Sequence, residues 1–244
     1  VLFRYAPMGG LVMAFQDFNP TKLFASEWVG FRNFRFLFAN PRTGLLVTNT
    51  LILSLLFLIA IRISSILLAL LLNEIRLKVF KRVTQGIIFL PYFVSWPIVA
   101  AMLWGLIDPD LGTINEYIGL VGLEPIDFAA RPDLWRGLLT TLRVWRSTGS
   151  GSVMYLAALA SIDPALYEAA AVDGANRLQR MRHISFPALM PLIIITTIIA
   201  VGGLFSSDVG MLYAVVGTAY KALYPAIDTI DFYILRSLTT SIEY

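Results

Sequence analysis

The sequence contains no cysteine, and His183 is its single histidine. Without cysteine, the chain cannot form disulfides, use a thiol nucleophile or bind a metal through thiolates. One histidine likewise excludes a metal site built from several imidazoles. The pattern G-x-x-x-x-G-K-[ST] is also missing, so the chain offers no nucleotide-binding loop of that kind.

Charged residues are scarce as well. They make up 14% of the 244 residues, against 57% hydrophobic residues and a mean hydropathy of +0.73. A soluble domain contains about 25% charged residues. The long apolar runs and the shortage of charge therefore predict an all-α membrane protein. The net charge is only +3, and we expect no nucleic-acid partner.

Apolar runs predict four full spans, near residues 44–73, 85–107, 138–162 and 188–206. The first is longer than the roughly 20 residues that a bilayer requires, so we expect it to tilt, kink or project. The second contains two prolines, and we expect the run RVWRSTGSGS to interrupt the third. Residues 1–16 carry no cleavable leader and do not begin with Met, which is typical of a partial first span in a longer protein.

The placement of Lys and Arg predicts which connections are cytoplasmic. Residues 74–82 carry four basic residues and one acid, so we place them inside. Residues 108–135 carry six acids and one arginine, so we place them outside. Alternation then makes residues 163–187 cytoplasmic and residues 207–244 an outer segment in which we see no convincing span.

Residues 17–43 form an outer loop by the same alternation, although they carry four basic residues. Within this loop, the run EWVGFRNFRFLF places aromatic residues at near-helical spacing, with Arg32 and Arg35 elsewhere on the surface. The aromatic residues are Trp28, Phe31, Phe34 and Phe38. Their spacing predicts a short helix in the outer membrane interface. A structured loop with scattered aromatics is the alternative.

Residues 163–187 are a polar, helix-forming segment between two apolar runs. Asp163 can cap a helix, and Pro164 is tolerated at its first position. Gly174 interrupts the helix-forming residues, and Pro187 marks the return to the membrane. The pattern predicts a helix–turn–helix that projects into the cytoplasm.

One face of this segment consists of small residues, which suits close approach by another protein. Glu168 and Asp173 can meet cations on such a partner. We expect His183 to be a solvated or docking residue rather than a switch. The alternative is an amphipathic connector whose pattern only satisfies caps and packing.

The spacing within this segment resembles a family signature. Glu-Ala-Ala, three residues, Gly, nine residues and Ile-x-Leu-Pro is typical of permease subunits of binding-protein-dependent ABC importers. The matching residues here are Glu168, Ala169, Ala170, Gly174 and the run from Ile184 to Pro187. The one departure is Phe186, an apolar residue in place of an apolar residue.

The resemblance covers nearly the whole chain within one branch of that family. The runs APMGGLVMAFQDFNP, WVGFRNF, LALLLNE, LPYFVSWPIV and YPAIDTIDFYILRSL are similar to the large permease subunit of oligosaccharide and polysaccharide importers, of maltose and alginate type. This implies a single type I ABC importer transmembrane domain over residues 1–244. It also implies about five visible spans of a six-helix core, with a last helix beyond Tyr244.

The same resemblance implies the function and the partners. The protein would be a multi-pass transport subunit of the bacterial inner membrane and not an enzyme. Residues 163–187 would hold the coupling helix that docks on a cytoplasmic ATPase, with Glu168, Ala169, Ala170, Asp173 and Gly174 at the contact. The implied partners are a second permease subunit, two ATPase subunits, an extracytoplasmic solute-binding protein, the lipid bilayer and a saccharide substrate. ATP and magnesium would belong to the ATPase subunits, and this chain would hold no cofactor.

Charged and aromatic residues in the apolar runs predict a substrate path. A charge inside a bilayer costs about 2.5–3.5 kcal/mol on insertion scales, so it usually faces a cavity or a partner. Arg143 and Arg146 share a helix face just before the Gly/Ser run, and they can meet the carboxylates of an acidic glycan. Pairing with acids of a partner subunit, or snorkelling, is the alternative. The predicted path is Tyr92, Trp96, Arg143, Arg146, Ser150, Ser207 and Asp208.

Arg62 is a weaker candidate, because its neighbours IRISS can simply mark a helix break.

Two other classes of function fit the sequence less well. An ion-coupled secondary transporter or channel needs intramembrane carboxylates, and the predicted spans have almost none. A membrane-embedded enzyme needs a convergent catalytic set, which one histidine, no cysteine and scattered acids do not provide. The leading hypothesis is a permease that imports oligosaccharides or polysaccharides by alternating access, with an acidic, alginate-like substrate as its narrower form.

Overall fold

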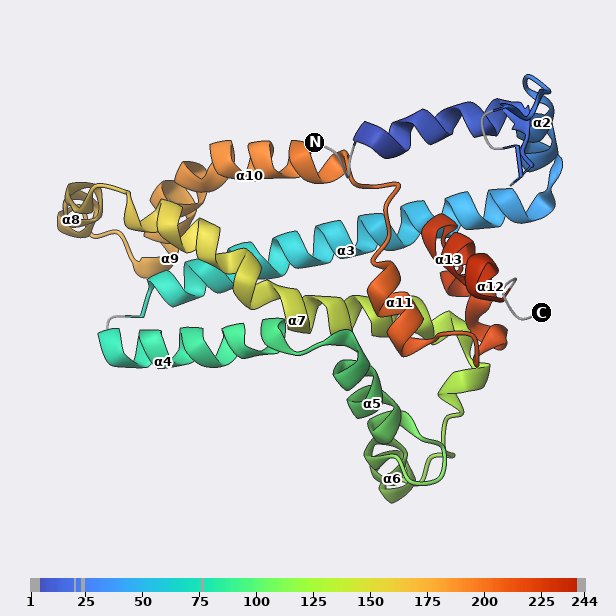
Figure 1. Cartoon of the computed structure of the whole chain (residues 1–244). Coiled ribbons are helices and arrows are strands. Elements are labelled where there is room, and N and C mark those ends of the chain that lie inside the picture. The colour runs from blue at the N-terminus through green and yellow to red at the C-terminus, as the bar shows by residue number, and fades with distance from the viewer. Residues whose placement is uncertain (1–4, 20, 23–24, 76, 241–244) are drawn as a thin grey trace. The chain divides into compact units, whose positions relative to one another are not determined.

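The computed structural model describes residues 5–19, 21–22, 25–75 and 77–240, most of which are helical (Figure 1). Residues 1–4 of the predicted first span, position 76 and residues 241–244 of the predicted outer segment lie outside the described residues. The chain divides into two compact units, Val1–Thr48 and Asn49–Tyr244.

The first unit combines short helices with a two-stranded sheet. Its elements are η1 (Ala6–Phe15), β1 (Gln16–Asp17), β2 (Glu27–Trp28), α2 (Arg32–Ala39) and the start of α3 (Pro41–Asn73). The strands are antiparallel, with Gln16 opposite Trp28. The side-chain amide of Asn33 donates to the carbonyls of Ala14 and Gln16 at 3.0 and 2.9 Å, which ties α2 to η1 and β1.

The predicted interfacial helix is only partly correct. Trp28 lies in strand β2, and its ring stacks on Phe15 with centroids 5.7 Å apart. Phe31 and Phe34 also contact Phe15, whereas Phe38 is 77% exposed. The helix therefore covers only the second half of the aromatic run. The strand pair was not predicted, because it depends on residues 16 and 28 meeting across a loop.

The second unit holds most of the helices. They are α4 (Lys78–Phe89), η3 (Leu90–Phe93), α5 (Trp96–Ile107), α6 (Thr113–Leu120), η4 (Phe128–Ala130), α7 (Pro132–Ala160), α8 (Pro164–Val172), α9 (Arg177–Arg180), η5 (Met181–Ser185, a π-helix), α10 (Phe186–Val201), α11 (Val209–Val215), η6 (Lys221–Leu223), α12 (Tyr224–Ile227) and α13 (Ile230–Thr240). Helix α7 contacts α4, η3, α10 and α12, and so forms the centre of this unit.

Two apolar clusters hold the second unit together. The larger one includes Leu53 of α3, Trp135 and Leu139 of α7, and Phe232 of α13. The smaller one packs the later part of α3 against the later part of α7 and α10, around Tyr155. The two clusters occupy different segments of α3 and α7, which leaves the segments between them for polar residues.

Fewer helices meet a simple length and hydropathy test for spanning than the five predicted. Within the described part of the chain, two do so: α3 with a hydropathy of 2.7, and the continuous stretch Arg177–Val201 with a hydropathy of 2.3. A third is the pair Lys78–Phe93 and Trp96–Ile107, if the two are counted as one span. Helix α7 is long enough at 29 residues but carries the polar run RVWRSTGSGS in its middle.

Helix α3 confirms the first predicted span, whereas the next one differs from its prediction. The residues predicted as one span over 85–107 belong to two helices, which are bent by 96° at Val94 and Ser95. Pro97 lies in the first turn of α5, where its missing N–H leaves no hydrogen bond unmade. The last predicted span, 188–206, begins earlier and ends at Val201.

The predicted interruption of the third span is wrong, because α7 is continuous from Pro132 to Ala160. Its hydroxyls bond back to carbonyls of their own helix, as in Thr148 to Val144 at 2.7 Å and Ser150 to Ser147 at 3.0 Å. The glycines allow close helix packing instead of a break. A Cβ atom added at Gly149 would lie 2.3 Å from the carbonyl oxygen of Ile88, and one at Gly151 would lie 2.4 Å from the Ser65 hydroxyl.

We therefore expect Gly149→Ala to lower the free energy of unfolding by about 1–3 kcal/mol, because the new methyl group would press on the main chain of α4. Thermal unfolding of the detergent-purified protein measures this effect. Gly105→Ala is the matched control, since a Cβ there meets nothing within 4 Å. Equal melting midpoints for the two variants would contradict the close approach of α4 and α7.

Candidate functional site

The polar segment between α7 and α10 forms a capped turn. The Asp163 carboxylate accepts a hydrogen bond from the Ala165 amide at 2.9 Å and so caps α8. Gly174 ends this helix at a φ of +80°, a conformation that favours glycine. The amide of Ala175 donates to the carbonyl of Ala170 at 2.8 Å, and that of Gly174 donates to the carbonyl three residues earlier at 3.1 Å. This pair of bonds is a Schellman motif, which fixes the direction of the turn.

The second arm of the turn is capped as well. The side chain of Asn176 accepts from the Gln179 amide at 2.9 Å, while the Gln179 side chain accepts from the Asn176 amide at 2.8 Å. This capping box starts α9, and the π-turn of η5 carries the helix on into α10 without a break. The predicted helix–turn–helix is confirmed. Its second helix continues directly into the apolar helix.

The predicted contact residues are accessible on this loop. Glu168, Ala169, Asp173 and Gly174 are exposed, and Ala170 is half-buried. Three large apolar side chains are exposed beside them, and the sequence pattern did not single them out: Leu166, Val172 and Leu178, at 55%, 88% and 72%. The available signal was their apolar character in a segment placed outside the membrane. Exposed apolar side chains on a rigid loop are typical of a docking surface.

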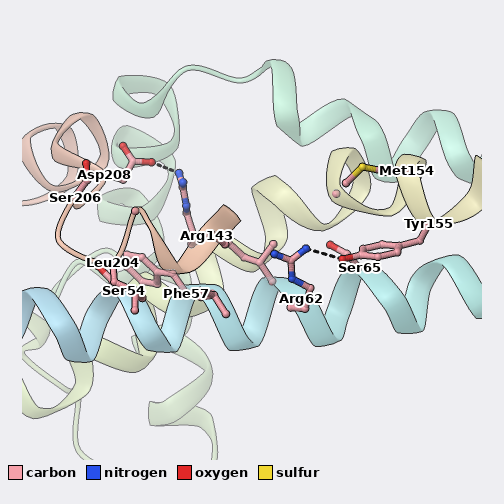
Figure 2. A pocket seen from close by; sticks show the side chains of 15 residues that line it. Ser54, Phe57, Arg62, Ser65, Arg143, Met154, Tyr155, Leu204, Ser206 and Asp208 are labelled. Atoms are coloured by element: carbon pink, nitrogen blue, oxygen red, sulfur yellow. Dashed lines mark hydrogen bonds and ion pairs between the residues drawn. The ribbon is translucent and has the colours of Figure 1, made fainter. Parts of the chain in front are cut away.

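A second candidate site is a cavity of about 300 Å³ in the second unit (Figure 2). It is lined by α3, α7, the end of α10 and the segment that follows α10. Its polar lining residues are Ser54, Arg62, Ser65, Arg143, Ser206 and Asp208. Of these, Arg62 and Ser65 on α3 and Arg143 on α7 lie in the segments between the two apolar clusters, whereas Ser54 lies beside Leu53 of the larger cluster.

Arg143 is paired within the chain. Its Nη1 forms an ion pair with Oδ2 of Asp208, and both side chains are partly buried (Figure 2). The other carboxylate oxygen of Asp208 accepts from the Met211 amide at 3.1 Å and caps α11. The prediction paired Arg143 with a glycan or with acids of a partner subunit, whereas the acid that pairs with it here comes from the same chain. Nε of Arg143 and the hydroxyl of Ser54 are nevertheless buried without a described hydrogen-bond partner.

Arg146 has a different environment. Its Nε donates to the Val94 carbonyl at 2.9 Å, at the bend between η3 and α5. The guanidinium lies 4.5 Å from the ring centroid of Trp96 and 5.9 Å from that of Tyr92. Among the described residues, no acid lies within ion-pair distance of it. The structure thus brings five of the predicted path residues together, since Arg143 is also 5.9 Å from the Trp96 ring and pairs with Asp208.

Two predicted path residues are used elsewhere. Ser150 bonds back to its own helix. The amide of Ser207 donates to Asp231 at 2.8 Å, and its hydroxyl is 2.8 Å from that of Thr229. Neither serine is among the described residues that line the cavity.

Arg62 is a stronger candidate in the structure than in the sequence, where it ranked below Arg143 and Arg146. Helix α3 is continuous through Arg62, so the interpretation of IRISS as a helix break is wrong. Its Nη1 donates to the Tyr155 hydroxyl at 2.6 Å and to the Thr196 hydroxyl at 2.7 Å, and its Nη2 donates to the Thr196 carbonyl at 2.9 Å. These bonds connect α3, α7 and α10 at one point of the cavity wall.

Comparisons with known proteins identify the family to which this chain belongs. Residues 61–220 match the family described as the binding-protein-dependent transport system inner membrane component. The chain belongs to this family. It is therefore an inner-membrane permease subunit of the ABC importer type, as the spacing from Glu168 to Pro187 indicated, and the ion-coupled transporter is set aside.

Individual relatives agree with this assignment. The chain is 40% identical over 230 residues to the polygalacturonan/rhamnogalacturonan transport system permease protein YteP of Bacillus subtilis, which covers 94% of this chain and 72% of that protein. It is 38% identical to Protein LplB of the same organism, with the same coverage. A solved bacterial ABC transporter that imports the acidic polysaccharide alginate matches with a TM-score of 0.87 and 35% identity, over 100% of this chain and 81% of that one.

Proposed function

We propose that this permease subunit carries acidic oligosaccharides inward, powered by separate ATPase subunits. The observation that carries the proposal is the cationic wall beside the bend of α4 and α5. Arg143 retains a buried Nε without an acceptor, and Arg146 has no acid within ion-pair distance in the described structure. A carboxylate is the acceptor that a guanidinium binds most strongly.

The aromatic rings beside these arginines support a saccharide. Trp96 and Tyr92 offer flat faces of the kind that pack on the apolar faces of sugar rings. Relatives support the charge of the substrate: one permease serves polygalacturonan and rhamnogalacturonan transport, and the solved transporter imports an acidic polysaccharide. A polyuronate presents both features at once, a carboxylate and an apolar ring face.

The coupling loop supports the transport mechanism. It is inserted between α7 and α10, two helices that line the cavity and continue without a break to the loop. A displacement of the loop would therefore be transmitted along two rigid helices to the substrate site. In alternating access, ATP-driven closure of two ATPase subunits would move the loops together, and a substrate that binds the two conformations differently would shift between them.

The proposal assigns the remaining parts to partners. A second permease subunit would complete the pathway, and a solute-binding protein would deliver the substrate from outside. ATP and magnesium would be held by the ATPase subunits, and this chain would perform no hydrolysis. The absence of a G-x-x-x-x-G-K-[ST] loop from the sequence supports that division of labour.

Charge removal tests the substrate class. Arg143→Gln with Arg146→Gln is expected to lower the uptake of a uronate oligosaccharide at least tenfold, since hydrogen bonds to charged groups contribute about 1.5–3 kcal/mol each. Uptake of a neutral oligosaccharide of the same length should fall less than about threefold, because the aromatic faces are retained. The measurement is transport by proteoliposomes that contain the complete transporter and its binding protein.

Arg131→Gln is the matched control for the loss of positive charge, because the side chain of Arg131 is 55% exposed and pairs with Asp133. Equal losses for the uronate and the neutral sugar in the double variant would contradict recognition of charge by these arginines.

A further inference from the structure

We infer that Arg62, held by Tyr155 and Thr196, is a second carboxylate-binding site, on the cytoplasmic side of the Arg143–Asp208 pair. An acidic substrate would occupy it after leaving Arg143 and before its release inward. The inference rests on the proposed function and adds to it a specificity-determining residue on another helix.

The first observation is the lack of a counter-charge. All three hydrogen bonds of Arg62 go to uncharged oxygens, two hydroxyls and a carbonyl. In the described part of the structure, no Asp or Glu lies within 4.0 Å of its guanidinium. A guanidinium has five N–H donors, and these bonds leave two of them for a ligand. A cation in so apolar a helix usually faces a partner or a cavity, and here it faces a cavity.

The second observation is the charge balance of that cavity. Its described lining includes two arginines, Arg62 and Arg143, and one acid, Asp208, which is already engaged by Arg143 and by the cap of α11 (Figure 2). One positive charge is therefore left over. The volume of about 300 Å³ lies at the lower end of the range for small-molecule sites, so a single sugar residue is a suitable occupant.

The third observation is depth. Tyr155 follows Arg143 by about three turns of α7, a rise of about 18 Å. Helix α7 runs from the outer connection toward the cytoplasmic loop, so the Arg62 site is the inner of the two. With arginines at successive depths, each carboxylate of a uronate chain could pass from Arg143 to Arg62 and remain paired with a positive charge.

The contacts of Arg62 are suited to positioning its guanidinium. The Tyr155 ring is only 1% exposed, and its hydroxyl lies 3.2 Å from that of Thr196, which is itself bonded to the Leu192 carbonyl at 2.8 Å. The three helices joined here are already packed by the smaller apolar cluster around Tyr155. Packing alone therefore gives no reason for a permanent charge at this position.

The test compares Arg62→Gln with Arg62→Lys in the complete transporter, reconstituted with its binding protein. Transport of a uronate trisaccharide and of a neutral trisaccharide is measured as kcat and KM. Arg62→Gln is expected to lower kcat/KM for the uronate at least tenfold and for the neutral sugar less than threefold. Arg62→Lys, which keeps the charge, should recover uronate transport to within about fivefold of wild type.

Thr196→Val separates positioning from charge. It removes one hydrogen bond to Arg62 but leaves the cation, so a modest loss for the uronate with little change for the neutral sugar is expected. Equal losses for both sugars in Arg62→Gln, with no selective recovery in Arg62→Lys, would show that Arg62 only connects the helices. That result would overturn the inference. In that case the double variant at Arg143 and Arg146 would still distinguish the sugars, and the proposed function would stand. Failure of the wild-type transporter to move uronates would overturn both.

Discussion

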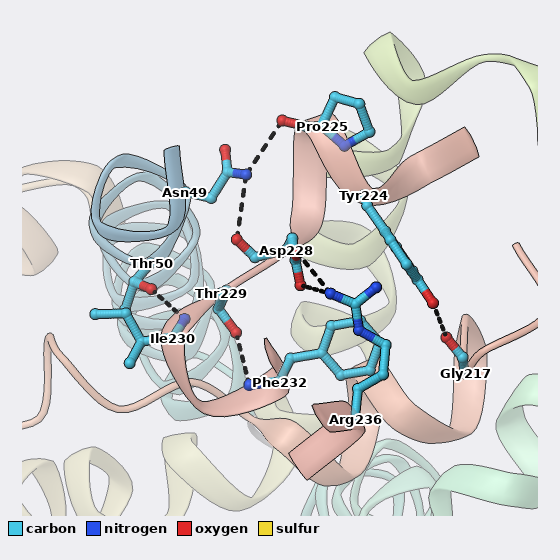
Figure 3. A network of polar contacts seen from close by, with 10 residues as sticks. All are labelled: Asn49, Thr50, Gly217, Tyr224, Pro225, Asp228, Thr229, Ile230, Phe232 and Arg236. Atoms are coloured by element: carbon cyan, nitrogen blue, oxygen red, sulfur yellow. Dashed lines mark hydrogen bonds and ion pairs between the residues drawn. The ribbon is translucent and has the colours of Figure 1, made fainter. Parts of the chain in front are cut away.

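Asp228→Ala is expected to lower the free energy of unfolding by about 3–5 kcal/mol, because it would leave the charge of Arg236 buried without its acid. The Asp228 side chain is 1% exposed and that of Arg236 is 12% exposed. Nη2 of Arg236 donates to both carboxylate oxygens, at 3.1 and 2.9 Å (Figure 3). The guanidinium also lies 3.8 Å from the ring centroid of Tyr224, a contact that the cation retains in the variant.

The neighbourhood of this pair explains why the effect should be large. Asn49 donates to the carbonyls of Pro225 and Asp228 at 3.1 and 3.3 Å (Figure 3). Its own side-chain oxygen accepts from Arg136 at 2.8 Å. The amide of Ile230 donates to the Thr50 hydroxyl at 3.0 Å. These bonds fix the turn between α12 and α13 against α3, so the turn has little freedom to move Arg236 into water.

Two comparisons make this stability prediction specific. Asp133→Ala removes the acid of an exposed pair and should leave the melting midpoint close to that of the wild type. Asp228→Leu combined with Arg236→Met replaces the buried pair by apolar groups and should recover most of the loss, since a buried pair contributes little net stability. Thermal unfolding in detergent measures all three variants. The same midpoint for Asp228→Ala and Asp133→Ala would show that the pair is not buried in the protein.

The parts of the fold that were predictable are those that depend on neighbours in the sequence. Helix α3 follows from a long apolar run, and the helix–turn–helix at residues 163–187 follows from an acid before a proline at Asp163 and from a glycine at position 174. Each of these signals acts within a few residues, through a cap or through a backbone angle. The structure therefore reproduces them with small shifts in the boundaries.

The parts that were not predictable depend on distant neighbours. Gly149 suggested a break in α7, but the glycine instead allows close packing. The carbonyl of Ile88 occupies the space that a side chain at position 149 would need. Arg62 meets Tyr155 and Thr196 across 93 and 134 residues of sequence, so nothing near it in the sequence indicated which groups it would contact. The bend between α4 and α5 falls in the same class, because Arg146 of α7 satisfies the Val94 carbonyl there.

The candidate path was recognisable only in part, because its charged residues stand out in the sequence while their contacts depend on the fold. A charge in an apolar run signals a partner, which singled out Arg143 and Arg146 as candidates, but the identity of the partner requires the fold. Ser150 and Ser207 were grouped with them because they are polar. Their hydroxyls are engaged by a carbonyl one turn back and by Thr229. A hydroxyl carries less positional information than a charge, because its hydrogen bonds can be made almost anywhere along a helix.

Gly174→Pro is expected to lower substrate uptake at least a hundredfold while the protein still inserts into the membrane. Gly174 has a φ of +80°, and proline is restricted to about −65°. Proline also lacks the N–H that donates to the Ala171 carbonyl at 3.1 Å, so the Schellman turn between α8 and α9 cannot form. Gly174→Asn should lose less than about fivefold, because asparagine tolerates the left-handed conformation.

Gly122→Pro is the matched control for this turn. Gly122 has nearly the same φ, +78°, and its amide donates to Gly119 at 2.9 Å, but it lies in the connection that we place outside the membrane. The strain is therefore similar in the two variants, and only one of them alters the surface that carries Glu168. Copurification of the ATPase subunits should fall for Gly174→Pro and remain at the wild-type level for Gly122→Pro.

Glu168→Ala separates docking from the direction of the turn. The caps of α8 and α9 do not involve Glu168, so the loop should keep its shape and lose only a charge that can meet a cation on the ATPase. We expect a tenfold or larger fall in uptake, accompanied by weaker ATPase association, as measured by copurification and by binding-protein-stimulated hydrolysis. Wild-type uptake and hydrolysis in both Glu168→Ala and Gly174→Pro would show that α8 is not the coupling helix. A loss of uptake in Gly174→Pro alone would contradict the role of Glu168 but would still support the role of the turn. The two outcomes can be separated because the Glu168 side chain takes no part in the hydrogen bonds of the turn.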